Sequence, residues 1–184
     1  MSDAGKDTVW RAKAIEAVGE FGSDASEAVP DIVNVLNGNP DIFEQIAAVA
    51  TLGKIGTGAK AAVPTLSTRL NHELLIFRLE PALAIWRITG NTEDTIPVIV
   101  EVLQNVEPPL DRFSAALTLS EFGPAAKSAI PALQAALELP EAYKDLEDGE
   151  DAYGLVRVQI ASALWEISQD GTVVVPSLIE QLVS

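Results

Sequence analysis

The sequence predicts an all-α fold, a superhelix of about five stacked helical hairpins, on the basis of two observations. Prolines recur at intervals of 34, 33, 34 and 45 residues, at Pro30, Pro64, Pro97, Pro131 and Pro176. Apolar residues return around each proline, at the position before it and at two and six residues after it. A period in the low thirties is typical of hairpins that can bury their apolar faces only by stacking on their neighbours.

Each repeat is expected to hold two helices joined by a sharp turn. In residues 47–55 apolar and small side chains fall three and four apart, the spacing of one face of a helix. Glycine follows in three repeats, at Gly22, Gly56 and Gly123. A chain that must end a helix and turn sharply prefers this residue, because glycine tolerates a positive φ. The third and fifth repeats lack this glycine at the same position, so we expect different turns there.

The second helix of each repeat is expected to begin at the repeat proline. Proline fixes φ and has no N–H, which is tolerated in a first helical turn. Residues 59–62, just before Pro64, are compatible either with the start of this helix or with a separate short turn. The third repeat also has Pro81 inside its first helix. We expect a kink within residues 74–88, at a cost of about 3 kcal/mol in an unsupported helix.

Residues 48–56, followed by residues 61–66, resemble the HEAT repeat, in the short bacterial form that is also seen in phycobilisome lyase subunits. The resemblance covers about residues 8–183. It implies one HEAT-repeat solenoid with repeats at about 8–38, 41–71, 73–105, 108–139 and 154–183. Members of this family are mostly non-catalytic binding scaffolds, so the resemblance implies a protein or peptide partner. The alternative that it implies is an accessory or chaperone-like subunit of an enzyme, similar to the bilin lyase subunits.

Composition restricts the partners and the compartment. The net charge is −15, with 27 acidic and 12 basic residues, which argues against nucleic acid and against an anionic membrane surface. No run of about eighteen apolar residues and no N-terminal apolar stretch is present, so we expect neither a spanning helix nor a secretory signal. Cysteine is absent, which excludes disulfides and thiol catalysis and agrees with a cytoplasmic location.

A catalytic or metal site is not expected. His72 and Glu73 resemble the His-Glu pairs of deoxyhypusine hydroxylases, which are also HEAT-like and would need several such pairs. This chain has one histidine, which cannot complete a transition-metal site or a nucleophilic triad. We therefore predict no cofactor, no metal and no enzymatic activity.

Arginine recurs nineteen residues before the repeat proline, at Arg11, Arg78, Arg112 and Arg157, with Gln45 in the second repeat. A ladder of ligand-binding arginines is one interpretation. The favoured interpretation is a local strut that pairs with a helix end or with an acid of the adjacent repeat, because repetition through the stack is what an architectural role predicts.

An acidic insertion over residues 138–154 lengthens the interval between the fourth and fifth repeats by eleven residues relative to 34. It holds both tyrosines of the chain, Tyr143 and Tyr153. Insertions in solenoids map to loops and often take part in binding. Three interpretations stay open: a solvated acidic loop, partner contact through the tyrosines and acids, and calcium bound by Asp145, Glu147 and Asp148.

The second helices are expected to line the concave side of the stack and to present a partner groove there. If the residues two, three and six after the proline face inward, those one, five and eight after it form an outer ridge. In the third and fourth repeats the apolar members of this ridge are Val98, Val102, Ala132, Ala136 and Leu139. Exposed apolar patches often mark contact sites. The alternative is that tight closure or the insertion covers these residues.

The last helix ends the repeat pattern with apolar side chains that would normally pack between repeats. They are Val175, Leu178, Ile179 and Leu182. Solenoid ends usually need a polar cap. The sequence therefore predicts either that a longer protein continues here or that the last repeat self-associates.

Overall fold

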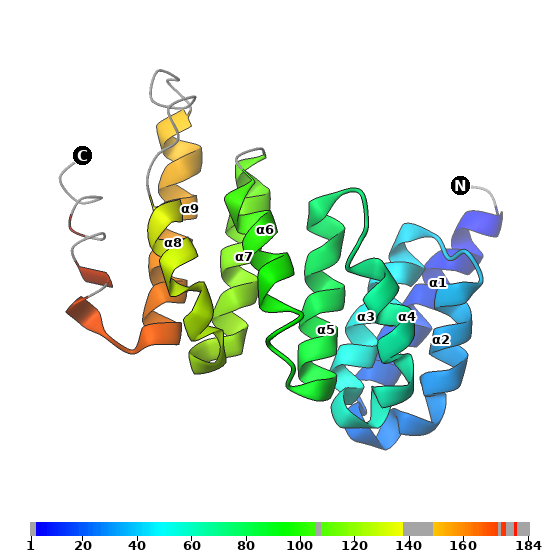
Figure 1. Cartoon of the computed structure of the whole chain (residues 1–184). Coiled ribbons are helices and arrows are strands. Elements are labelled where there is room, and N and C mark those ends of the chain that lie inside the picture. Colours follow the sequence, from blue (N-terminus) through cyan, green and yellow to red (C-terminus); the bar gives the residue numbers. More distant parts are fainter. Residues whose placement is uncertain (1–2, 106–107, 138–148, 173, 176–178, 180–184) are drawn as a thin grey trace. The chain divides into compact units, whose positions relative to one another are not determined.

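The computed structural model describes residues 3–105, 108–137, 149–172, 174, 175 and 179 (Figure 1). Throughout this part of the chain the regular elements are α-helices and short 3₁₀ helices, with no strand. The all-α fold class that the sequence predicts is therefore confirmed.

The chain divides into two compact units, Met1–Asn91 and Thr92–Ser184. The division falls inside the expected third repeat, after its first helix and before its second.

The first unit holds five α-helices: α1 (Asp3–Gly19), α2 (Val29–Asn37), α3 (Ile42–Ile55), α4 (Val63–Arg69) and α5 (Leu79–Thr89). The first helices of successive repeats pack side by side, α1 on α3 and α3 on α5, while α2 packs on α3 and α4 on α5. Short 3₁₀ helices, Gly22–Ala28 and Gly56–Ala62, join the two helices of a repeat, and a third, Leu75–Arg78, precedes α5. This unit therefore has the stacked-hairpin arrangement of a helical repeat.

The second unit repeats the arrangement with α6 (Ile96–Gln104), α7 (Pro109–Phe122), α8 (Ile130–Ala136) and α9 (Gly149–Ser168). The first helices α7 and α9 pack on one another, and the second helices α6 and α8 are also in contact. A 3₁₀ helix, Gly123–Ala129, joins α7 to α8.

The turn and proline predictions are confirmed in the first four repeats, and Pro176 of the fifth repeat lies outside the described residues. Gly22, Gly56 and Gly123 have φ of 54°, 66° and 52°, in the region that glycine favours. A proline lies in the first turn of α2, α4, α6 and α8. The short stretch before it is a separate 3₁₀ helix in the first, second and fourth repeats. The third repeat differs, as expected: Gly90 caps α5 with φ 72°, and no 3₁₀ helix precedes α6.

Pro81 does not kink a helix. The α-helical conformation begins at Leu79, after the 3₁₀ helix Leu75–Arg78, so Pro81 is the third residue of α5. A residue in the first turn of a helix has no intrahelical acceptor for its N–H. The chain therefore avoids the expected cost by starting α5 late, and the discontinuity lies before the proline instead of at it.

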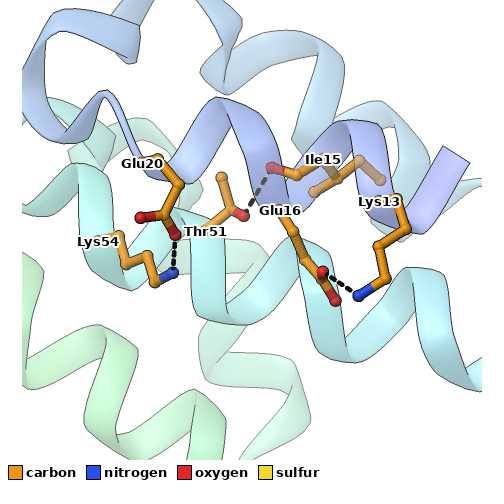
Figure 2. Close-up of polar contacts among 6 residues, drawn as sticks. All are labelled: Lys13, Ile15, Glu16, Glu20, Thr51 and Lys54. Atoms are coloured by element: carbon orange, nitrogen blue, oxygen red, sulfur yellow. Dashed lines mark hydrogen bonds and ion pairs between the residues drawn. The ribbon is translucent and has the colours of Figure 1, made fainter.

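Polar contacts as well as apolar packing join α1 to α3 (Figure 2). The Thr51 hydroxyl donates to the backbone carbonyl of Ile15 over 2.9 Å, in a buried position. At the surface the Lys54 ammonium lies 2.6 Å from the Glu20 carboxylate and lowers the pKa of that carboxyl. Gly19 permits the close approach, because a Cβ at this position would lie 3.0 Å from the Thr51 hydroxyl oxygen.

One helical run, Ile42–Arg69, has the length and mean hydropathy, 1.2, of a membrane span. The run comprises α3, a 3₁₀ helix and α4, and Gly56 breaks it with a φ of 66°. Half of its most apolar window is buried inside the protein. Its apolar character is therefore accounted for by packing, since Ala48, Leu52 and Leu66 are fully buried core residues.

Candidate functional site

The ridge expected on the second helices is not an exposed surface. Val102 is 0% exposed and Ala136 is 5% exposed, whereas Val98 and Ala132 are half-buried. Leu139 lies outside the described residues. The prediction of an exposed apolar ridge is therefore wrong at the two positions five residues after the proline.

The spacing of the helix explains this burial. Val102 follows the core residue Ile99 of α6 by three residues. Ala136 follows the core residue Leu133 of α8 by the same interval. Residues three apart share one face of an α-helix. Because α6 and α8 pack on one another, this face lies in the second unit's core.

Tyr153 is a core residue, not a surface contact. It lies within α9, which already begins at Gly149, so residues 149–154 of the expected insertion are helical. The tyrosine is 1% exposed, and the Arg112 guanidinium carbon lies 5.5 Å from its ring centre. Burial of this ring excludes direct partner contact in this conformation. Tyr143 and the carboxylates proposed for calcium, Asp145, Glu147 and Asp148, lie outside the described residues.

The arginine positions support the strut interpretation. Arg112 is 4% exposed and donates to the Ala136 carbonyl, at the end of α8, over 2.8 Å. Arg78 donates to the His72 carbonyl over 2.6 Å, and Arg11 pairs with Glu44 of the adjacent repeat. These side chains join secondary-structure elements within one unit, which is an architectural role.

His72 also has local contacts. Its Nδ1 accepts a hydrogen bond from the Leu74 backbone N–H over 3.1 Å, and its ring meets the Phe77 ring edge-on at 5.0 Å. Within the described ranges, no cluster of three or more histidine, aspartate or glutamate side chains is placed to hold a metal ion.

An exposed set of apolar side chains lies on the first helices. The residue twenty-one positions before the repeat proline is apolar in all five repeats, and we call this set the apolar ladder: Val9, Phe43, Ile76, Leu110 and Leu155. Four of its members are 40–69% exposed and Ile76 is half-buried. Core packing does not require an apolar residue at a position that is exposed in this way, so its recurrence calls for another explanation.

Helix geometry places the apolar ladder opposite the core. Phe43 stands nine residues before Leu52, and nine residues make two and a half turns at 3.6 residues per turn. Leu110 stands nine residues before Leu119, and Leu155 stands nine residues before Leu164. Leu52, Leu119 and Leu164 are completely buried. Phe43, Leu110 and Leu155 therefore point away from the core of their own unit.

Neighbouring helices bring ladder residues side by side within each unit. Val9 lies on α1 and Phe43 on α3, which pack together, and Leu110 and Leu155 lie on α7 and α9, which also pack together. Packed helices are about 8–10 Å apart, so adjacent ladder side chains are within reach of one partner segment. Two further exposed residues, Ile46 and Val158, stand three residues after ladder positions and widen the strip.

Charged side chains lie beyond the apolar ladder, toward the C-terminal ends of the first helices. Eleven residues after each ladder position, about three turns along the same face, every repeat has an exposed charged residue: Glu20, Lys54, Arg87, Glu121 and Glu166. The exposed face of the first helices is therefore apolar near the helix starts and charged near the helix ends. The apolar part of this surface can contribute to binding by burial of its apolar area.

The apolar ladder could have been found in the sequence. Aligning the repeats on their prolines reveals the recurring apolar position directly. The sequence does not say which recurring apolar positions are buried. Only the exposed fractions separate the ladder from the core positions.

A cleft in the second unit lies between α9 and the segment that follows it. It has a volume of about 330 Å³ and is lined mainly by apolar residues of α9 and the segment after it, among them Val158, Trp165 and Val174. Val175 and Ile179 are 50% and 53% exposed. Leu178 and Leu182 lie outside the described residues. Self-association through this repeat stays a prediction.

Comparison with known proteins gives one family match. Residues 111–138, which include α7 from its third residue on, the following 3₁₀ helix and α8, match the PBS lyase HEAT-like repeat. Neither curated proteins nor solved structures gave a match. The matched segment is most of one hairpin of the second unit, and it has the glycine turn and the proline start that recur elsewhere in the chain. The family match thus confirms the predicted resemblance to the HEAT repeat, and it covers residues 111–138 of the chain.

Proposed function

We propose that this chain is a non-catalytic scaffold that binds a protein partner, and that the apolar ladder on the first helices is the contact surface. HEAT-like repeats are helical repeats that often mediate protein interactions, and the match at residues 111–138 supports this class. The observation on which the proposal rests is the recurrence of an apolar side chain at one position of all five repeats, exposed in four of them and half-buried in the third.

The expected groove on the second helices has less support than the ladder. Its central residues, Val102 and Ala136, are buried, so they have no area to offer. Phe43, Leu110 and Leu155 each keep more than 60% of their accessible surface. Exposed apolar side chains that form a contiguous strip are the usual mark of a contact site.

The energetics set a minimum size for the contact. Full burial of a leucine or phenylalanine side chain contributes about 1.5–3 kcal/mol, so the two ladder leucines of the second unit, Leu110 and Leu155, supply about 3–6 kcal/mol. Association costs about 4–15 kcal/mol in lost freedom of motion. A stable complex therefore needs polar contacts beside the ladder residues of one unit, and the charged helix ends can provide them.

The proposal is tested by affinity capture from lysate of the source, with bound proteins identified by mass spectrometry. The test variant replaces Phe43, Leu110 and Leu155 by serine. The control variant carries Phe21→Ser and Leu74→Ser, since these side chains are 70% and 59% exposed but lie off the ladder. A dominant protein that is lost only with the ladder variant supports the proposal. Equal capture by all three proteins would contradict it.

An accessory role in an enzyme complex is a second candidate, favoured by the lyase name of the matched repeat family. On this view the captured protein is itself an enzyme, and the ladder holds it in place. The discriminating measurement is the activity of the captured enzyme with and without this chain. The predicted cytoplasmic location is tested separately by fractionation of the source cells.

A further inference from the structure

A cleft in the first unit lies beside the buried carboxylate of Glu44, which is not part of the apolar ladder. The cleft has a volume of about 310 Å³ and lies among α1, α2 and the start of α3. Its polar lining residues are Arg11, Asp31, Asn34, Asn39 and Glu44. The lining also includes Val35, Gly38 and Pro40.

Glu44 is held in place by the start of α3. Its backbone N–H donates to the Asp41 carboxylate over 2.8 Å, and its own Oε2 accepts from the Asp41 backbone N–H over 3.2 Å. This reciprocal pair is a capping box, which satisfies two backbone donors that the helix start would leave free. The Glu44 side chain is fixed as a result, and it is only 4% exposed.

The second carboxylate oxygen of Glu44 is incompletely satisfied. Oε1 accepts no hydrogen bond, although the Arg11 Nη1 lies 3.0 Å from it. The Arg11 side chain is 59% exposed, so it reaches the buried carboxylate from solvent. A buried charge is costly unless it is both paired and hydrogen-bonded, so Oε1 retains the capacity to accept a well-placed donor.

The charge and the size of the cleft restrict what it can accept. Two carboxylates, of Asp31 and Glu44, face one guanidinium, which disfavours an anion. The volume lies at the lower end of the range for ligand pockets, about 300–1,000 Å³, so it suits one side chain better than a cofactor. The resident Arg11 demonstrates that a guanidinium can approach Oε1.

We propose that this cleft binds the guanidinium group of an arginine side chain from a protein partner, which displaces Arg11 and donates to Glu44 Oε1 in its place. A charge-assisted hydrogen bond from a planar guanidinium to a carboxylate is among the strongest that proteins use. The chain carries a net charge of −15, which attracts a basic partner from a distance. The arginine's origin in a protein rests on the proposed function, but the binding of a guanidinium does not.

The experiment uses the full chain, uniformly labelled with ¹⁵N, and two small probes. Nα-acetyl-arginine amide carries the guanidinium, and Nα-acetyl-citrulline amide has nearly the same shape without the charge. We expect saturable changes in the backbone amide shifts of Asn39 and Glu44 with the arginine probe only. Equal changes with both probes, or changes spread evenly over the acidic surface without saturation, would overturn the proposal.

Two variants shift the affinity in opposite directions. Glu44→Gln removes the charge but retains the capping box, which glutamine also forms, and should weaken binding of the arginine probe about tenfold or more. Arg11→Gln removes the competing guanidinium and should tighten binding several-fold. Circular dichroism of each variant confirms that it is folded. Unchanged binding in both folded variants would overturn the proposal.

The arginine-probe experiment can fail independently of the affinity-capture experiment that tests the scaffold function. The probes require no partner, and both substitutions lie off the apolar ladder. If partner capture depends on the ladder but the arginine probe does not bind, the scaffold function stands and this cleft has no part in it. If the probe binds but no partner is captured, the guanidinium site stands and the scaffold function fails.

Discussion

Replacing Arg112 by methionine is expected to destabilise the second unit by about 2 kcal/mol. The guanidinium donates to the Ala136 carbonyl over 2.8 Å, and such a bond from a charged donor contributes about 1.5–3 kcal/mol. It is a cation at the C-terminal end of α8, which adds about 0.3–1 kcal/mol. Its carbon lies 5.5 Å from the Tyr153 ring centre, a contact that contributes about 0.5–2 kcal/mol.

Desolvation opposes these gains and limits the net effect. Arg112 is 4% exposed, and its Nε is buried without a hydrogen-bond acceptor. A buried unsatisfied polar group costs about 1–3 kcal/mol, and methionine removes this cost. The net loss of about 2 kcal/mol is therefore smaller than the sum of the three contacts.

Urea and thermal unfolding followed by circular dichroism measure this loss. For a chain of this size, about 2 kcal/mol lowers the melting temperature by about 4–8 °C. A double-mutant cycle with Tyr153→Leu should give a coupling free energy of about 0.5–2 kcal/mol. Lys13→Ala is the surface control, since its pair with Glu16 is exposed and contributes little.

A methionine variant as stable as the native chain would refute the strut interpretation. It would mean that desolvation of the guanidinium outweighs its contacts, as occurs for some buried ion pairs. The recurring arginines would then need a role outside folding, and the ligand ladder would be the interpretation to test next.

Three further substitutions test the packing and the charges. Gly53→Ala should lower the free energy of unfolding by about 1–3 kcal/mol in urea, because the new Cβ would lie 3.2 Å from the α5 backbone. Gly154→Ala is the matched control: nothing lies within 4 Å of its Cβ, so it should raise the free energy of unfolding by up to about 1 kcal/mol. Thr51→Val should cost about 1 kcal/mol in the same assay by removing a buried hydrogen bond to α1. Lys54→Ala should raise the pKa of Glu20 in an NMR titration, because the ammonium now lowers it. The stability that this pair gives is present above the unfolded pKa and is lost as the pH falls through the lowered folded value, so the two proteins should converge in acid.

Features that depend on a few neighbouring residues could be predicted closely. The positive φ at Gly56 and the position of Pro64 in a first helical turn follow from local backbone sterics. A structural role for Arg112 could be predicted, because an arginine that recurs in most repeats indicates a role in the fold. Its acceptor, the Ala136 carbonyl at the end of α8, could not be predicted. The kink expected at Pro81 was wrong because the start of α5 depends on the preceding 3₁₀ helix, which no pattern in the sequence predicts.

The sequence by itself determined the repeat, the helical hairpin and the positions of the turns, since periodicity and backbone preference act over a few residues. It also held the apolar ladder, as a position that is apolar in every repeat. Only the tertiary structure decided which recurring apolar positions are buried. Val102 and Leu110 are both apolar, yet one is enclosed by neighbouring helices and the other is 69% exposed. Burial depends on which helix packs against each face, and residues far apart in the chain decide that packing.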